Sequence, residues 1–122
     1  MFVTQSEKLR DVKIVNNVIK NDIQNFLKGA VYCWCKNRNN ESFSLQSLMG
    51  GDNFYWQGTP LYKLYQEKAK VDKSNAIEEA AKSAGWLLKK VLAEDKHRYY
   101  EVVKGYVNSY RCVKINCNLE EE

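Results

Sequence analysis

The chain has 122 residues, of which 44% are hydrophobic and 12% aromatic, and its formal net charge is +4. This composition fits one globular domain, 1–122, with a packed core, and it excludes a disordered or collagen-like chain. No apolar run is long enough to cross a membrane, and the first residues lack the pattern of a secretory signal. We therefore expect a soluble cytoplasmic protein without a membrane partner.

The first half of the chain predicts one long helix. Thr4 and Glu7 have the spacing of a capping box, so residues 1–17 are expected to form an N-terminal helical extension. The apolar periodicity is most regular from Val18 to about Asn37, which predicts a central core helix at the start of a folded core spanning 18–116. A short helix over residues 45–49 is expected next, capped by Ser44 and ended by Gly50.

Residues 50–60, "GGDNFYWQGTP", hold three consecutive aromatic residues between glycines. The segment lacks the lysine of a phosphate-binding loop. We expect it to connect two helices, with its rings pinning it to the core. An exposed aromatic side chain could instead anchor a protein partner or a homodimer, so Phe54, Tyr55 and Trp56 are candidate interface residues.

Two further helices and a hairpin are predicted beyond this connector. Thr59 and Pro60 suit the start of a helix over 60–70, and Asn75 with Glu78 offers a capping box for a helix over 76–94. That second segment is either one helix or two helices with a turn at Gly85. Tyrosine and valine then predict strands over 99–104 and 109–115, joined at 105–108, before an acidic tail over 117–122. The fold class is mainly α with a small C-terminal β-hairpin.

Helices followed by a terminal hairpin resemble the winged-helix DNA-binding domains. The resemblance rests on "FSLQSL" after the long helix, where the short strand and second helix of a winged domain fall, and on Ala81-x3-Gly85 followed by Val91. The layout is similar to that of winged domains appended to phage- and plasmid-type replication proteins. Glu94 departs from the helix-turn-helix pattern, which has an apolar residue near that position. In an alternative alignment, 60–70 is the recognition helix and 76–94 is an added core helix.

This resemblance implies a non-catalytic protein that contacts DNA. Residues 60–114 carry 12 basic and 7 acidic side chains, and a basic surface suits a polyanion. The expected binding is dominated by phosphate contacts and weakly specific, because few Arg, Asn or Gln residues lie on the predicted helix. The alternative is a solvated lysine-rich surface. The expected contact residues are Lys82, Lys89, Lys90, Lys96, Arg98, Lys104 and Arg111.

The sequence predicts neither an enzyme nor a metalloprotein. His97 is the only histidine, and no nucleophile accompanies it in a catalytic motif. The spacings Cys33-x-Cys35 and Cys112-x4-Cys117 place the members of each pair on different faces, so reduced and mostly buried thiols are expected rather than a zinc site. We expect no cofactor and no small-molecule substrate.

Overall fold

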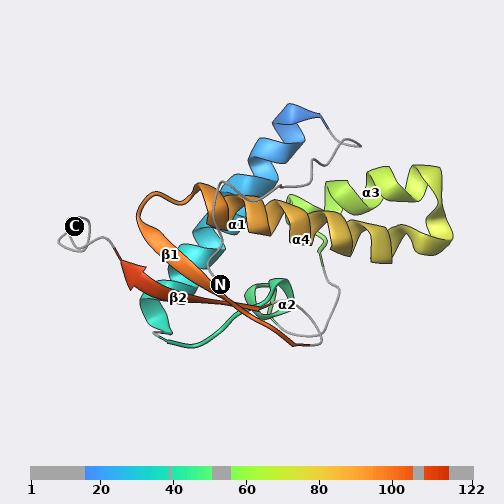
Figure 1. Cartoon of the computed structure of the whole chain (residues 1–122). Coiled ribbons are helices and arrows are strands. Elements are labelled where there is room, and N and C mark those ends of the chain that lie inside the picture. The colour runs from blue at the N-terminus through green and yellow to red at the C-terminus, as the bar shows by residue number, and fades with distance from the viewer. Residues whose placement is uncertain (1–15, 39, 51–55, 106–108, 116–122) are drawn as a thin grey trace.

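The computed structural model describes residues 16–38, 40–50, 56–105 and 109–115. It is mainly helical and ends in a two-stranded antiparallel hairpin, which confirms the predicted fold class (Figure 1). The predicted N-terminal extension, apart from its last residues, and the predicted acidic tail lie outside the described residues. The elements are α1 (Asn17–Asn37), α2 (Leu45–Leu48), α3 (Leu61–Val71), the 3-10 turn η1 (Lys73–Asn75), α4 (Ala76–Glu94), β1 (Arg98–Val103) and β2 (Ser109–Ile115).

Helix α1 begins where an asparagine side chain caps it. Asn16 Oδ1 accepts a hydrogen bond of 2.9 Å from the backbone N–H of Ile19, which satisfies one of the unpaired donors of the first turn. Four residues of α1 at successive four-residue steps are buried, so a single face of the helix enters the core. They are Ile23, Leu27, Val31 and Cys35.

The segment after α1 pairs with the C-terminal hairpin. Phe43 and Tyr110 exchange two backbone hydrogen bonds of 2.7 Å each, which form an isolated antiparallel bridge beside β2. Ser44 then starts α2, because its hydroxyl accepts from the backbone of Ser47 and the Ser47 hydroxyl accepts in return from the backbone of Ser44. The predicted short helix is therefore confirmed, with its cap.

Two predicted helix caps are wrong. The Thr59 hydroxyl does not cap α3 but donates to the carbonyl oxygen of Trp56 at 2.8 Å, and Pro60 precedes the helix without a side-chain cap. Asn75 makes no capping bond to α4: its φ of −110° and ψ of 8° depart from the extended backbone typical of a capping residue, and its Nδ2 donates to Asp72 at 2.9 Å. Asp72 also accepts from the backbone and hydroxyl of Ser74, so the Asp72 carboxylate organises the link between α3 and α4.

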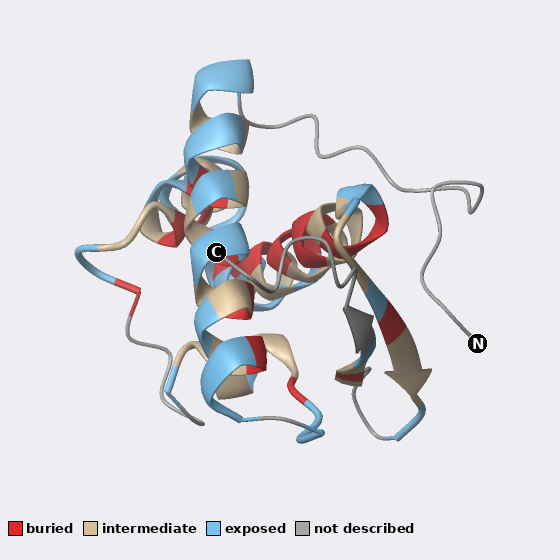
Figure 2. Ribbon diagram, turned by 90° about the vertical axis from the view of Figure 1, so that its left-hand side faces the viewer, coloured by how far each residue is buried: buried red, intermediate tan, exposed pale blue. Residues whose placement is uncertain are grey.

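Helix α4 runs without interruption through Gly85. Its inner face is broad, with eight buried residues that include Ala80, Ala84, Leu88 and Leu92, and it packs against α1 and α3 (Figures 1 and 2). A helix-turn-helix with its turn at Gly85 is therefore wrong. The alternative alignment, with α3 as the recognition helix, stays a prediction.

The hairpin alternates between a face toward the core and a face toward solvent. Tyr100 pairs with Cys112 and Glu101 with Arg111, and the register shifts between Tyr99 and Tyr100. Tyr100 is buried, whereas Tyr99 is exposed. The two predicted strands are thus confirmed to within a residue, but the register shift, which leaves Val113 of β2 without a pair, has no signal in the sequence.

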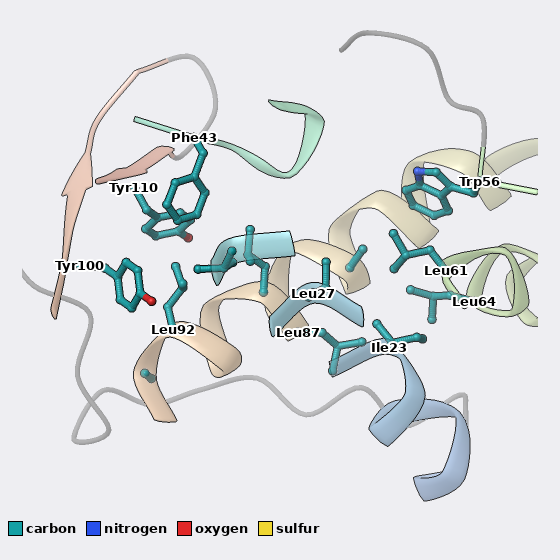
Figure 3. Packing of buried hydrophobic residues seen from close by; sticks show 14 of the residues in the cluster. Ile23, Leu27, Phe43, Trp56, Leu61, Leu64, Leu87, Leu92, Tyr100 and Tyr110 are labelled. Carbon is teal, nitrogen blue, oxygen red and sulfur yellow. The ribbon is translucent and has the colours of Figure 1, made fainter. Parts of the chain in front are cut away.

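One hydrophobic core extends along the whole of α4 (Figure 3). At one end, Phe43 contacts the rings of Trp34, Tyr100 and Tyr110, with ring centroids 6.1 to 6.2 Å apart. The other end gathers Trp56 and the inner face of α3, namely Leu61 and Leu64. The rings near the hairpin are thus in the distance range at which aromatic pairs attract one another beyond simple burial.

Replacing Phe43 should strongly destabilise the protein. The side chain is 1% exposed and lies among three rings, so Phe43→Ala should lower the free energy of unfolding by about 3 to 5 kcal/mol. Phe43→Leu, which keeps much of the apolar volume, should cost clearly less. Urea denaturation followed by tryptophan fluorescence measures both, and a loss below about 1 kcal/mol for Phe43→Ala would contradict this packing role.

Replacing Gly85 should stabilise the protein. A Cβ at this position meets no atom within 4 Å, and the residue lies inside a helix, where alanine is more favourable than glycine. Gly85→Ala should therefore raise the free energy of unfolding by about 0.5 to 1 kcal/mol. Gly58→Ala is the matched control, because Gly58 has a φ of +84° and alanine there should instead lower stability. Equal changes in the free energy of unfolding for Gly85→Ala and Gly58→Ala would refute this explanation.

Candidate functional site

A groove of about 350 Å³ lies between α1 and the junction of α4 with β1. Its lining comes from three parts of the chain that the core packing brings together. Helix α1 provides Gln24, Asn25, Lys28 and Tyr32, helix α4 provides Val91 and Glu94, and the turn after it provides Asp95, Lys96 and His97. The volume is at the lower end of the range for small-ligand pockets.

The Asp95 carboxylate fixes the turn beside this groove. Its Oδ1 accepts from the backbone N–H groups of His97 and Arg98, at 2.8 and 3.1 Å, and its Oδ2 accepts from the Tyr100 hydroxyl at 2.5 Å. Burial, followed by this contact with Asp95, raises the pKa of Tyr100, so the hydroxyl keeps its proton and stays a donor. The turn is therefore tied to the core through a buried tyrosine.

Tyr32 lies between two cationic side chains. The Arg98 guanidinium carbon lies 4.4 Å from the centroid of the Tyr32 ring, and Lys28 Nζ lies 5.9 Å from it. Both distances suit attraction between a cation and an aromatic ring. Burial, with a smaller contribution from Asp95, raises the pKa of Tyr32, so the phenol is neutral. Tyr32 thus positions positive charge at the groove.

Two buried donors near the groove lack hydrogen-bond partners among the described residues. They are Gln24 Nε2, on a residue that lines the groove, and Nε of Arg98, the side chain that stacks on Tyr32. Such groups are uncommon in folded proteins and costly, because each loses its bond to water without a replacement. Two buried donors thus lie beside a groove whose lining also carries Lys28 and Lys96.

The three predicted contact lysines of α4 do not share one face. Lys82 and Lys89 are seven residues apart and lie on the same face, whereas Lys90 lies about 100° around the helix from Lys89. Lys82 is also within 3.8 Å of Glu78 and of Glu79, so acidic neighbours offset its charge. This α4 surface is less basic than its lysines alone suggest.

The other predicted contact residues lie along the hairpin. Lys96 and Arg98 flank the turn before β1, and Lys104 follows the opposite end of that strand. Arg111 is paired with Glu101 on the neighbouring strand at 2.6 Å. The structure therefore brings Lys96 and Arg98 together and keeps Lys104 apart from them, and it gives Arg111 a carboxylate partner.

The predicted partner interface is corrected at Trp56. This side chain is only 4% exposed and belongs to the core, so it secures the connector as expected and cannot serve as an exposed anchor. Phe54 and Tyr55 lie outside the described residues. Sequence reasoning left the position of Trp56 open because a three-residue aromatic run does not show which ring turns inward.

The sequence patterns did not predict that α1 lines the groove. Gln24, Lys28 and Tyr32 recur every four residues, and this spacing places them on one face of the helix. The pattern was available, but only the packing of α1 against α4 shows that this face meets the α4–β1 turn.

The described cysteines do not form a metal site. Cys33 is exposed, Cys35 is buried and Cys112 is half-buried, so the expectation of mostly buried thiols is wrong for the described cysteines. The two-residue spacing does place Cys33 and Cys35 on different faces of α1, as predicted. The hydrogen bond with the Cys112 thiol, together with burial, raises the pKa of Cys35, so this residue stays a neutral thiol. Within residues 16–38, 40–50, 56–105 and 109–115, no cluster of three His, Cys, Asp or Glu side chains could hold a metal ion. Cys117 lies outside these ranges.

No family model, no curated protein and no solved structure matches the chain. None of the helices in the described part of the chain has both the length and the apolar character needed to cross a membrane.

Removing the Tyr100 hydroxyl should weaken the turn beside the groove. Tyr100→Phe leaves Asp95 without one of its three donors, and we expect the free energy of unfolding to fall by about 1 to 2 kcal/mol. Tyr99→Phe is the matched control, because Tyr99 is 56% exposed and its hydroxyl should contribute almost nothing. Urea denaturation compares the two variants, and equal losses would show that the bond to Asp95 does not stabilise the turn.

Proposed function

We propose that this protein binds nucleic acid through phosphate contacts, without catalysing a reaction, and that its fold is winged-helix-like. The layout is supported by the bridge between Phe43 and Tyr110, which pairs the segment after α1 with β2. This is the segment in which the sequence resemblance expects the short strand. The continuous α4 favours the form of the resemblance in which α4 is an added core helix.

The observation that carries the proposal is a series of cations from the end of α4 to the end of β1. Lys90, Lys96 and Lys104 have no carboxylate partner within ion-pair distance among the described residues, and Arg98 stacks on Tyr32. Lysine and arginine side chains that are not neutralised by the protein can neutralise phosphates and release their counterions. Lys82 and Arg111 have acidic neighbours, so we expect them to contribute less than the sequence suggested.

A cytoplasmic location belongs to the same proposal. The free thiols of Cys33 and Cys35 fit it, because thiols persist in reducing compartments. We do not extend the proposal to a homodimer or to a protein-interaction role, since Trp56 is buried and the other residues of that predicted interface are not described.

Charge reversal along this series should weaken binding to DNA. Lys90→Glu with Lys104→Glu should raise the Kd for a 20-base-pair duplex of arbitrary sequence at least about tenfold in low salt. It should also reduce the slope of log K against log salt by about 0.9 for each phosphate that the protein no longer neutralises. Fluorescence anisotropy with a labelled duplex measures both quantities.

The control for this experiment changes the net charge equally at other positions. Lys36→Glu with Lys63→Glu alters two exposed lysines of α1 and α3 and should change the Kd only slightly. The proposal fails if the unmodified protein does not bind the duplex in low salt. It fails equally if the two double variants lose the same affinity, because net charge alone would then explain the binding.

A further inference from the structure

We propose that the groove between α1 and the α4–β1 turn binds a phosphate monoester of a small hydroxylated group, such as a sugar phosphate. The inference goes beyond the proposed DNA contacts. Lys96 and Arg98 belong to both proposals, but Lys28 comes from α1 and is absent from the proposed DNA-contacting series, so substitutions of Lys28 test the groove separately.

Charge argues for an anionic ligand. Lys28 and Lys96 both line the groove, one from α1 and one from the turn, and neither has a carboxylate partner among the described residues. A phosphate monoester is close to a dianion at neutral pH, so two cations and nearby N–H donors suit it. The Arg98 guanidinium, stacked on Tyr32, adds positive charge behind one wall.

Two carboxylates also belong to the lining, and they differ in availability. Asp95 already accepts three hydrogen bonds, from two backbone N–H groups and a buried hydroxyl, and Arg98 is adjacent to it. Glu94 is exposed and makes no such bonds among the described residues. Both carboxylates oppose an anion, but Asp95 also holds the turn, so Glu94 is the carboxylate whose removal tests this effect and should strengthen binding.

Size and polarity argue for more than an inorganic ion. A volume of about 350 Å³ exceeds what a phosphate group fills, so the group attached to the phosphate would also lie in the groove. Gln24 and Asn25 both line it, and Asn25 is exposed. Gln24 Nε2 itself is buried and has no partner in the described part of the chain, so a ligand reaches this donor only when the Gln24 side chain turns toward the groove. An oxygen-rich group can accept hydrogen bonds from such amides, whereas an apolar group cannot.

Two kinds of molecule carry such a phosphate monoester, a free sugar phosphate and the end of a nucleic acid, and separate probes distinguish them. Ribose 5-phosphate represents a free sugar phosphate, and ribose is the same group without its charge. A short single-stranded oligonucleotide with a 5′-phosphate, compared with its 5′-hydroxyl form, represents a nucleic-acid end. Isothermal titration calorimetry at low salt measures ribose 5-phosphate and ribose, and fluorescence anisotropy measures the two oligonucleotides.

We expect ribose 5-phosphate to bind and ribose to fail. Lys28→Gln should weaken ribose 5-phosphate binding about tenfold, since it removes one charge-assisted contact. Glu94→Gln should strengthen it, and Lys36→Gln, a control on the same helix outside the groove, should leave the Kd within about twofold. Lys28 is exposed, so Lys28→Gln should keep the fold, which urea denaturation checks.

The outcomes distinguish this site from the proposed DNA contacts. Loss of duplex binding in the Lys90→Glu, Lys104→Glu double variant supports the proposed DNA contacts. Loss of sugar-phosphate binding in Lys28→Gln supports the groove. A preference for the 5′-phosphorylated oligonucleotide assigns the groove to nucleic-acid ends, and its absence assigns the groove to the free sugar phosphate. The inference is overturned if ribose binds as tightly as ribose 5-phosphate, if neither phosphate probe binds, or if Lys28→Gln binds as tightly as the unmodified protein.

Discussion

The pairing of Phe43 with Tyr110 fixes the position of the hairpin against the helices. A two-stranded hairpin is marginally stable by itself, so β1 and β2 need a surface to cover. Two backbone hydrogen bonds hold Phe43, in the segment between α1 and α2, against Tyr110 of β2. The Phe43 ring fills the space among Trp34, Tyr100 and Tyr110. Because Trp34 belongs to α1, the same contact also sets the position of that helix against the sheet. The hairpin is therefore part of the core and not an appendage.

The groove follows from this arrangement. Tyr100 reaches Asp95 from inside the core, and Asp95 in turn holds the backbone of His97 and Arg98. A turn fixed in this way presents Lys96 on one side and directs Arg98 across Tyr32 of α1. The backbone of this turn thus derives its position from Tyr100, which is packed in the core.

The sequence predicted those features that local patterns determine. Periodicity located the long helices and the hairpin, and a Ser44 cap located the short one, because each of these signals lies within a few residues. Thr59 does not cap α3 because Pro60 occupies the cap position, and Asn75 does not cap α4 because its backbone is not extended there. The register shift between Tyr99 and Tyr100 and the shared groove of Lys28 and Lys96 depend on contacts between distant segments. No spacing rule predicts such contacts.

Electrostatics shows why counting charges was insufficient to locate a site. The second half of the chain is basic by composition, yet Lys82 and Arg111 lie close to carboxylates that offset their charge. A surface lysine contributes to binding an anion only where the protein itself has not already supplied the opposite charge. Lysines without a carboxylate partner in the described residues occur on several elements, including α1, α3 and the far end of β1, so the absence of a partner does not by itself locate a site. What distinguishes the α4–β1 turn is that Lys96 lines the same groove as Lys28, a residue 68 positions earlier in the chain.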